Sequence, residues 1–341
     1  MAKHVYGVDF GTGNIKFYNG VTKKLLNEKN VIATKKGNVT YSFGDEAYEM
    51  YEKTPEQITV TFPIKYGVIA DMDRMTNLFE EFFHKVNLPK RKKSGDFCIA
   101  VPTDVSEVEK RAFYDLVADS KIKSRDIVVV EKPIADAVGV GIDVTANEGN
   151  MIVDFGADTT EISVVASGGI VLSKILKIGG NQLDEEIVSI IKKKYNILIG
   201  KKTAEIVKIA LANPLATEEE KMASVKVFGR NIISGLPASK VVTADLVNDA
   251  LMTNLNTLVD SIRSLLERTP PDLAADITEK GIYLTGGSSN IPNINHMISQ
   301  KTNLKVNEVK NPSLSVINGI AIILANPQLK GLLYTPCEND Y

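Results

Sequence analysis

The sequence predicts an α/β protein built as an internal duplication. A short string occurs twice, and strand-forming and helix-forming stretches alternate in both halves. The string reads Tyr6-Gly7-Val8-Asp9-Phe10-Gly11-Thr12-Gly13-Asn14 in the first half and Ile152-Val153-Asp154-Phe155-Gly156-Ala157-Asp158-Thr159-Thr160 in the second. In each copy an apolar run ends in Asp, an aromatic residue and Gly, and a turn of small polar residues leads into a second β-prone run. Each copy is therefore a predicted hairpin.

The first half alternates strands and helices. The predicted strands cover residues 5–9, 15–18, 96–101 and 127–130, and a region of short elements rich in Lys, Thr and Asn extends to about residue 66. A helix is predicted for 73–86 because apolar side chains recur at helical spacing, namely Leu78, Phe79, Phe82, Phe83 and Val86. Helices are also predicted for 107–119 and 133–139, the second beginning with a proline whose missing N–H does no harm in a first turn.

The second half repeats this order. A hairpin begins at residue 151, a helical insertion follows, and a strand at 281–285 precedes the closing helices. With 341 residues, of which 44% are hydrophobic and 24% charged, the chain should divide into two main domains. The predicted first lobe is 1–148, with a core of 1–32 and 72–148 and a small subdomain of 33–71. The second lobe is 149–325, with a core of 149–182 and 246–325 and a small subdomain of 183–245, and a C-terminal tail covers 326–341.

The composition argues against several classes of function. The net charge of -2 gives no general attraction to nucleic acid, so no nucleic-acid partner is expected. Cys98 and Cys337 lack metal-ligand spacing, and the three histidines lie far apart, so neither a disulfide framework nor a metal centre of these residues is expected. The chain starts directly with a strand, leaving no room for a signal peptide, and no apolar run approaches membrane-spanning length. A cytoplasmic protein is therefore expected.

The two turns have the composition of anion-binding sites. Gly and small residues allow consecutive backbone N–H groups to point into one concavity, which suits a phosphate, while an Asp at a strand end can hold a hydrated divalent cation. A single Gly-rich turn is usually structural, and roughly one in five binds phosphate. Two copies at the same place in two halves favour a duplicated phosphate clamp. The Asp-Phe-Gly string does not indicate a protein kinase, because no His-Arg-Asp catalytic loop precedes either copy.

These turns and several other strings resemble MreB, the bacterial actin family of the actin/Hsp70 superfamily. The resemblance extends from residue 5 to about residue 325 and implies an actin-like fold, an α/β duplication of two lobes with a nucleotide cleft between them and a smaller subdomain in each. Besides the two turns, it rests on the strings Pro63-Ile64-Lys65-Tyr66-Gly67-Val68-Ile69-Ala70-Asp71, Gly179-Gly180-Asn181-Gln182-Leu183-Asp184, Lys194-Tyr195-Asn196-Ile197-Leu198-Ile199-Gly200, Thr203-Ala204-Glu205, Thr269-Pro270-Pro271-Asp272-Leu273-Ala274-Ala275-Asp276-Ile277 and Leu284-Thr285-Gly286-Gly287.

The resemblance implies that the chain binds ATP or ADP with Mg²⁺. Asp9 and Asp154 would lie on either side of the metal and the phosphates. The backbone N–H groups that would bind the phosphates belong to Gly11, Thr12, Gly13, Asn14, Gly156, Ala157, Asp158, Thr159 and Thr160.

The resemblance also implies where the nucleoside binds. Glu205 and Lys208 match the ribose and adenine contacts of the family, and Gly286 and Gly287 would let a planar base lie against the backbone. Without the resemblance, a solvated i,i+3 ion pair between Glu205 and Lys208 would be favoured at roughly two to one.

One position departs from the family pattern. Members typically carry Glu-Glu-Pro before the helix that faces the γ-phosphate, and the Glu next to Pro orients the attacking water, whereas this chain reads Glu131-Lys132-Pro133. Lys132 cannot accept a proton as a carboxylate does, although it could bind the γ-phosphate as a point charge. Glu131 is a poor substitute, because neighbouring helical positions point about 100° apart. We therefore expect ATP binding with slow or undetectable hydrolysis.

Three further residues belong to this expectation. Asp136 stands at i+4 from Lys132, where the family usually has Ala, and is favoured as its ion-pair partner. Asp158 replaces a Gly beside Thr159. The carboxylates of Asp136 and Asp158 are therefore two alternative water-orienting groups. Thr159 remains and could retain a trace of activity.

The resemblance implies self-assembly. Subunits would stack head to tail into protofilaments that pair antiparallel beneath the membrane, with other MreB paralogues as further candidate partners. The loop that contacts the membrane in relatives contains four consecutive cations here, Lys90, Arg91, Lys92 and Lys93, preceded by Leu88. Peripheral contact with an anionic leaflet and a solvated basic loop are about equally favoured.

Two other functions on the same fold stay open at this point. One is a sugar or acetate kinase, which needs acceptor-site residues between the lobes, and the other is an Hsp70-like chaperone, whose peptide-binding domain has no counterpart here. A catalytically weak, divergent MreB paralogue is also compatible with the sequence. The absence of Trp and the abundance of Lys, Ile and Asn would suit an AT-rich genome, such as that of a wall-less bacterium.

Overall fold

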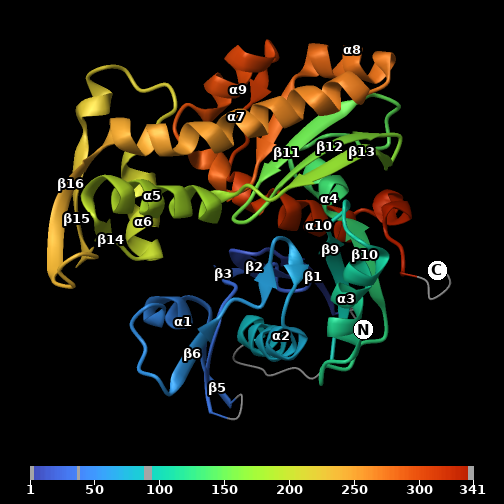
Figure 1. The fold of residues 1–341 in the computed structure, drawn as a ribbon. Coiled ribbons are helices and arrows are strands. Elements are labelled where there is room, and N and C mark those ends of the chain that lie inside the picture. Colours follow the sequence, from blue (N-terminus) through green and yellow to red (C-terminus); the bar gives the residue numbers. More distant parts are fainter. Residues whose placement is uncertain (1–3, 37–38, 88–93, 337–341) are drawn as a thin grey trace. The chain divides into compact units, whose positions relative to one another are not determined.

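The computed structural model describes residues 4–36, 39–87 and 94–336 (Figure 1). The chain divides into two compact units. Unit 1 comprises the described residues of Met1–Glu148, Ser163–Ile175 and Ser313–Tyr341, and unit 2 comprises Gly149–Ile162 and Leu176–Pro312. The lobe and subdomain boundaries given above remain predictions.

Unit 1 is built on a five-stranded sheet with the order β10-β9-β1-β2-β3. Strand β1 is parallel to β9 and antiparallel to β2, β9 is parallel to β10, and β2 is antiparallel to β3. The predicted first hairpin is therefore confirmed as β1 and β2. The bounds are β1 Val5–Phe10, β2 Asn14–Asn19, β3 Leu25–Lys29, β9 Asp96–Val101 and β10 Ile127–Glu131.

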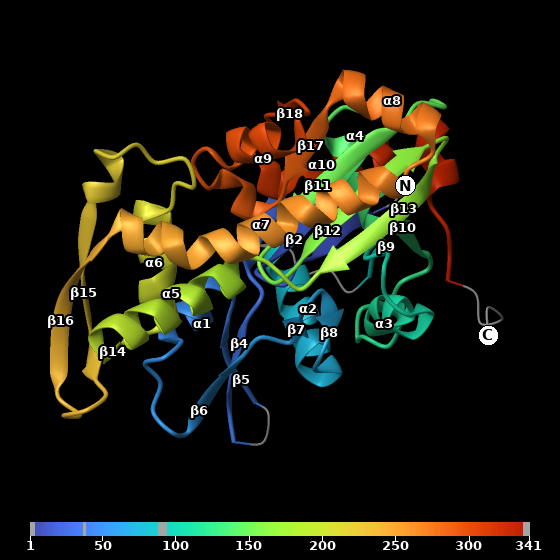
Figure 2. The same cartoon turned by 45° about the horizontal axis from the view of Figure 1, so that its top comes forward.

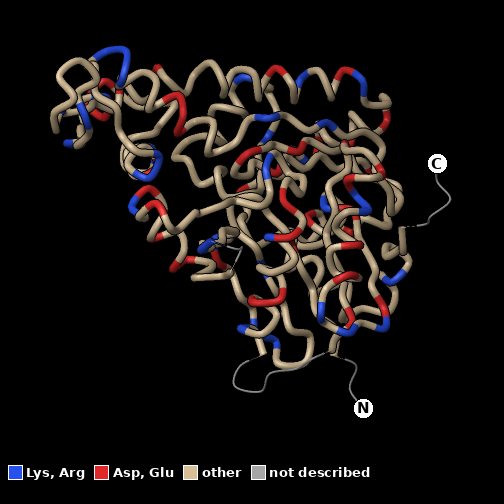
Figure 3. The backbone as a smooth tube through the Cα atoms, turned by 60° about the horizontal axis from the view of Figure 1, so that its bottom comes forward, with Lys and Arg blue, Asp and Glu red and all other residues tan. Residues whose placement is uncertain are grey.

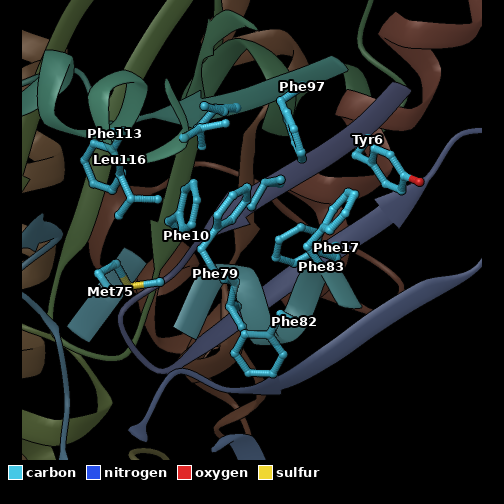
Figure 4. Packing of buried hydrophobic residues seen from close by; sticks show 14 of the residues in the cluster. Tyr6, Phe10, Phe17, Met75, Phe79, Phe82, Phe83, Phe97, Phe113 and Leu116 are labelled. Carbon is cyan, nitrogen blue, oxygen red and sulfur yellow. The ribbon is translucent and has the colours of Figure 1, made fainter. Parts of the chain in front are cut away.

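An aromatic cluster fills the core of unit 1 (Figure 4). The predicted stripe of the helix at 73–86 is confirmed, because all five of its apolar side chains are buried in α2 Met72–Val86. Phe79 lies 5.5 Å from Phe17 and 5.4 Å from Phe97, ring centre to ring centre, so the helix packs on β2 and β9. The Asp71 side chain accepts a hydrogen bond from the Arg74 N–H and begins the helix.

Two glycines bring α10 Ser315–Ala325 into close contact with α4 Lys132–Gly139. A Cβ atom on Gly319 would overlap the Ala135 carbonyl, and one on Gly139 would overlap the Ser315 carbonyl. Only glycine fits at such a close approach of two backbones. The position of α4, which begins with Lys132, is thus fixed by α10 within unit 1. The remaining long helix of unit 1 is α3 Glu107–Ala118, which begins with a Ser106 and Glu109 capping box.

The region described above as short elements contains a second, small sheet. Its order is β5-β4-β6, and a two-stranded hairpin, β7 and β8, follows it. Each strand has five residues or fewer, so neither alternation nor helical spacing was long enough to predict them. The bounds are β4 Ile32–Lys35, β5 Val39–Phe43, α1 Gly44–Met50, β6 Ile58–Thr61, β7 Ile64–Lys65 and β8 Val68–Ile69.

A second five-stranded sheet has the order β13-β12-β11-β17-β18, and the boundary between the units falls within β12. Strand β11 is parallel to β17, which places Asp154 opposite Thr285. The strands are β11 Asn150–Phe155, β12 Thr160–Ala166, β13 Gly169–Leu176, β17 Ile282–Thr285 and β18 Val306–Asn307.

The prediction of a helical insertion in the second half is wrong in part, because the inserted segment also contains a three-stranded sheet of order β14-β15-β16. Figure 2 shows this sheet beside α5 and α6. In β15 exposed positions alternate with half-buried or buried ones, which is the period of two that a strand imposes. The strands are β14 Ile197–Leu198, β15 Ser224–Asn231 and β16 Pro237–Thr243. The helices of unit 2 are α5 Gly180–Tyr195, α6 Lys201–Leu211, α7 Ala244–Arg268, α8 Pro271–Lys280 and α9 Ile294–Thr302.

Short 3₁₀ turns complete the chain, at Glu220–Met222, Gly287–Asn290, Pro312–Leu314 and Pro327–Leu332. After the last of them, Tyr334 forms an antiparallel bridge with Val129 of β10, so the tail covers an edge of the first sheet. Lys, Arg, Asp and Glu are distributed along the backbone of both units (Figure 3). Among the described residues, no helix combines the length and the apolar composition that a membrane-spanning segment needs.

Candidate functional site

The first Asp-Phe-Gly turn, in unit 1, retains unused backbone donors. Within the described part of the chain, the N–H groups of Gly11, Thr12 and Gly13 form no hydrogen bond. The carbonyls of the turn are occupied instead. The Asn30 side-chain amide donates to the Gly11 carbonyl at 2.9 Å, and the Asn30 backbone N–H donates to the Gly13 carbonyl at 3.0 Å. A turn whose carbonyls are engaged by the protein and whose N–H groups are unused is suited to bind an anion.

Asp9 stands at the end of β1 and is paired with a lysine that the sequence analysis missed. The Lys16 ammonium lies 2.9 Å from the Asp9 carboxylate, whose side chain is almost fully buried. The two residues are directly opposite each other in the antiparallel register of β1 and β2, so the hairpin pattern itself could have indicated the pair. Because Lys16 already balances the charge of Asp9, a divalent cation at Asp9 would have to compete with it. The ammonium also adds a positive charge beside the turn, 3.3 Å from where a Cβ atom of Gly11 would lie.

The second turn, in unit 2, is held by the beginning of α5. The N–H groups of Gly180 and Asn181 donate to the Gly156 and Ala157 carbonyls, at 3.1 and 2.7 Å. The Ser288 hydroxyl donates a further hydrogen bond to the Gly156 carbonyl at 2.7 Å. The pattern of the first turn is therefore repeated, with occupied carbonyls.

The amides of the second turn are only partly used. The Gly156 N–H closes the turn by donating to the Thr159 carbonyl at 2.9 Å. Over the residues that the structure covers, the N–H groups of Ala157 and Thr159 make no hydrogen bond. Asp158 accepts a hydrogen bond at 2.6 Å from the side-chain amide of Asn181, which engages the carboxylate proposed as a displaced water-orienting group.

Asp154 is the buried carboxylate of this turn, at the end of β11. It is 8% exposed. Gly286 has a positive φ of 83°, and a side chain there would overlap both the Phe155 carbonyl and the Asp154 carboxylate, so the turn after β17 must pack directly against Asp154. A Cβ atom at Gly287 would meet nothing within 4 Å, so this second glycine borders open space.

Lys208 belongs to the same corner of unit 2. Its ammonium lies 2.9 Å from the Asp184 carboxylate and donates to the Gly180 carbonyl at 2.7 Å. Its side chain is 11% exposed, so Lys208 is not solvated, and the contact of Glu205 and Lys208 with a nucleoside stays a prediction. Glu205 is half-buried one turn away on α6. The structure therefore brings Lys208, Asp184 and the start of α5 together beside the second turn.

Lys132 begins α4, and its neighbour Glu131 is engaged elsewhere in unit 1. The Tyr334 hydroxyl donates to the Glu131 carboxylate at 3.0 Å, and the Lys110 ammonium lies 3.5 Å from the same oxygen. Burial and the negative charge of Glu131 raise the pKa of Tyr334, so the phenol stays protonated and donates. Burial lowers the pKa of Lys110, but the carboxylates of Glu131 and Glu107 outweigh it and raise the pKa overall. Glu131 is thus held by α3 and the tail, which supports the expectation that it does not replace a missing base. Asp136 is fully buried in α4.

Three other features considered in the sequence analysis are not part of these turns. The basic loop Lys90, Arg91, Lys92 and Lys93 lies outside the described residues. No group of three or more His, Cys, Asp and Glu side chains that could hold a metal occurs among the residues that are described. Burial raises the pKa of the Cys98 thiol to about 12, so this thiol is unreactive at neutral pH.

A cavity of about 640 Å³ lies at the opposite end of the unit 1 strands, where Val5, Asp96 and Ile127 begin β1, β9 and β10. Asp9 stands at the other end of β1. The cavity is therefore separate from the candidate site.

Comparison with known proteins places the chain in a family. The model of the MreB/Mbl protein family matches residues 3–331. The cell shape-determining protein Mbl of Bacillus subtilis (strain 168) is 33% identical over 323 residues, which are 94% of this chain and 95% of the relative. The cell shape-determining protein MreB of Escherichia coli (strain K12) is 30% identical over 325 residues, covering 94% of this chain and 92% of the relative.

Solved structures agree with this assignment. MreB5 of Spiroplasma citri bound to AMPPNP superimposes with a TM-score of 0.89 at 30% identity, covering 95% of this chain and 96% of the other. A MamK double helical filament has a TM-score of 0.78 at 22% identity, covering 95% of this chain and 99% of the other. At this identity the likeness establishes a shared fold and nothing more. The fold is thus actin-like, as predicted, and the chain belongs to the MreB/Mbl family.

Proposed function

We propose that this chain is an ATP-binding, filament-forming actin-like protein of the bacterial cytoskeleton that contributes to cell shape or motility. The observation that carries the proposal is the repeated arrangement of the two turns, in which protein groups occupy the carbonyls and leave backbone N–H groups for an anion. Relatives are described as cell shape-determining, and MreB5 of Spiroplasma citri is described as bound to AMPPNP and to ADP. We therefore assign the anion as the phosphates of ATP or ADP.

The residues of the second turn fit a magnesium ion bound to a nucleotide better than those of the first turn do. Asp154 is a buried carboxylate next to unused amides, which suits a hydrated Mg²⁺ on a phosphate. Asp9 is paired with Lys16, so the first turn would bind phosphate through the Lys16 ammonium and the amides of Gly11 to Gly13. The bound Mg²⁺ would neutralise phosphate charge. Lys208 and Glu205, beside the second turn, are the proposed nucleoside contacts.

Self-assembly is the second part of the proposal. A head-to-tail contact between identical subunits does not close and generates a filament. The MamK relative is described as a double helical filament, while an antiparallel pair of protofilaments is what we propose for this chain. Electron microscopy of the purified protein with ATP, with ADP and with neither is the direct test. Filaments are expected with ATP, and a protein that stays dispersed in all three conditions would contradict the proposal.

Replacing Asn30 by alanine is expected to weaken nucleotide binding by about ten-fold, or about 1.4 kcal/mol. The substitution removes the donor to the Gly11 carbonyl, so the turn loses the contact that keeps this carbonyl engaged. The control is Asn19→Ala, because Asn19 is a similarly buried asparagine of unit 1, at the end of β2, that bonds to Asn87 instead. Both variants should lose some thermal stability, but calorimetry should show lost affinity for Asn30→Ala alone. Equal affinities of the two variants would mean that Asn30 only stabilises the fold.

Membrane contact through Lys90, Arg91, Lys92 and Lys93 remains a proposal from the sequence. Replacing all four by glutamine is expected to weaken sedimentation with anionic liposomes, since each cation near such a surface contributes about 1 kcal/mol. Raised salt should have the same effect, because exposed charges are screened over about 10 Å at about 0.1 M. Wild-type protein that sediments equally with neutral and anionic liposomes would rule out this electrostatic contact.

A further inference from the structure

The carboxylate of Glu131 is held by two side chains to which the proposed nucleotide site assigns no role. Its Oε1 atom accepts a hydrogen bond from the Tyr334 hydroxyl at 3.0 Å and lies 3.5 Å from the Lys110 ammonium. Its other oxygen, Oε2, is buried and has no hydrogen-bond partner within the described part of the chain. The phenol and the cation therefore act together on a single oxygen of this carboxylate.

Backbone hydrogen bonds place the Tyr334 hydroxyl beside Glu131. The Val129 N–H donates to the Tyr334 carbonyl at 2.8 Å, and the Tyr334 N–H donates to the Val129 carbonyl at 3.1 Å. Val129 and Glu131 are two residues apart on β10, so Tyr334 is the diagonal cross-strand neighbour of Glu131, a separation that an aromatic side chain can span. Lys110 reaches the same oxygen from α3, where it also pairs with Glu107 at 3.1 Å.

Glu131 stands at the edge of the sheet from which the first turn begins. Strand β9 lies between β1 and β10, with Ala100 opposite Asp9 and the next residue opposite Glu131. Neighbouring strands are about 4.8 Å apart, so the backbones of Asp9 and Glu131 are about 10 Å apart. Glu131 also directly precedes Lys132, the candidate contact of the γ-phosphate, and its side chain makes no hydrogen bond that caps α4. A carboxylate at this place without compensation would repel the phosphates of a nucleotide.

We propose that Tyr334 and Lys110 are positioning residues of the nucleotide site, which hold the Glu131 carboxylate and offset its charge so that the γ-phosphate can bind nearby. The inference rests on the proposed binding of ATP and deepens it, because it makes the C-terminal tail a determinant of the preference for ATP over ADP. ADP lacks the γ-phosphate, so a loss of this compensation should weaken ATP binding more than ADP binding.

The alternative explanation is a contact that only stabilises the fold. If the tail merely secured the edge of the sheet, disturbing it would lower the melting temperature and weaken the binding of both nucleotides alike. Charge compensation predicts a different pattern, because Tyr334 and Lys110 are no longer needed once position 131 carries no charge. The substitution Glu131→Gln therefore separates the two explanations.

The test is calorimetric titration in MgCl₂ with ADP and with AMPPNP, which is not hydrolysed. Tyr334→Phe with Lys110→Gln should lower the affinity for AMPPNP relative to ADP about ten-fold, the effect of an uncompensated charge at about 10 Å near a protein surface. Tyr334→Phe alone, which keeps the ring and the backbone bridge, should shift the ratio in the same direction by a smaller factor. Adding Glu131→Gln to the double variant should restore the wild-type ratio, although the tail contact is still missing.

The matched control is Tyr6→Phe with Lys121→Gln, two substitutions in the same unit. They remove a phenol hydrogen bond to Asn87 and an ion pair with Glu80, so the chemical changes are the same as in the double variant. The melting temperature should fall, and the ratio of the two affinities should stay at the wild-type value.

The outcomes distinguish this inference from the proposed function. A wild-type ratio in Tyr334→Phe with Lys110→Gln, or a lowered ratio that Glu131→Gln does not restore, would overturn the inference alone, since nucleotide binding would still be observed. A wild type that binds neither AMPPNP nor ADP would contradict the proposed function and this inference together.

Discussion

Replacing Asp154 by alanine is expected to weaken magnesium-nucleotide binding by at least an order of magnitude. Asp154 is nearly buried, ends β11 next to the unused amides of the second turn, and is packed against Gly286. A hydrogen bond to a charged group contributes about 1.5–3 kcal/mol, and about 1.4 kcal/mol is ten-fold in affinity. Calorimetry with ATP and MgCl₂ measures the effect directly. The loss should be smaller without magnesium, because the carboxylate is proposed to act through the metal.

The matched control for this prediction is Asp260→Ala. Asp260 is an aspartate of the same unit whose side chain is 74% exposed on α7, so its removal changes the net charge equally without touching the turn. Its nucleotide affinity should equal that of the wild type. Unchanged affinity in a folded Asp154→Ala protein would remove Asp154 from the site, while leaving the first turn and the fold unaffected.

The main elements of the fold could be predicted because their patterns are long and consistent. The string around Asp9 and its repeat around Asp154 both form the end of a buried strand and the turn that follows it. The helix α2 was predicted within one residue, since its apolar side chains recur at helical spacing from Leu78 to Val86. The β15 and β16 hairpin was missed because exposed apolar residues such as Phe228 and Val241 blur the alternation of buried and polar positions.

The candidate site could be predicted only where its residues are close in sequence. The turns at Gly11 to Asn14 and Gly156 to Thr160 are continuous, so their composition revealed them. Asn30 is 19 residues from the Gly11 carbonyl that it binds, and an asparagine before a strand carries no signal of such a contact. Asp184 and Lys208 are brought together only by the packing of α5 and α6, which periodicity does not specify.

Glu131 shows a different limit of sequence reasoning. Because Glu131 precedes Lys132 directly, the sequence left open whether the Glu131 carboxylate could orient the attacking water. Only the structure shows that Lys110 and Tyr334 hold it, and Tyr334 lies in the C-terminal tail, 203 residues away. No local pattern connects a tail tyrosine with an edge strand. The contact makes Lys132 the position at which a missing base should be restored.

Replacing Lys132 by glutamate is therefore expected to raise the rate of ATP hydrolysis, by up to about 10²–10⁴-fold, the usual contribution of a general base. Lys132 starts α4, and in the family pattern a glutamate at this position orients the attacking water. We propose that the lysine binds the γ-phosphate through its charge, whereas it accepts no proton. Phosphate release from the purified wild type and the variant, measured side by side with saturating ATP and magnesium, gives the ratio.

The control is Lys132→Gln, which separates the effect of gaining a proton acceptor from the effect of losing the positive charge of Lys132. Glutamine removes the positive charge without supplying a proton acceptor, so it should weaken ATP binding and leave hydrolysis slow. If glutamine accelerated phosphate release as much as glutamate, the lysine would act as an electrostatic brake rather than as a missing base. A wild type that already hydrolyses ATP as fast as Lys132→Glu would assign the water-orienting role to another carboxylate. Asp158 would then be the first to test, because Asn181 already holds it within the second turn.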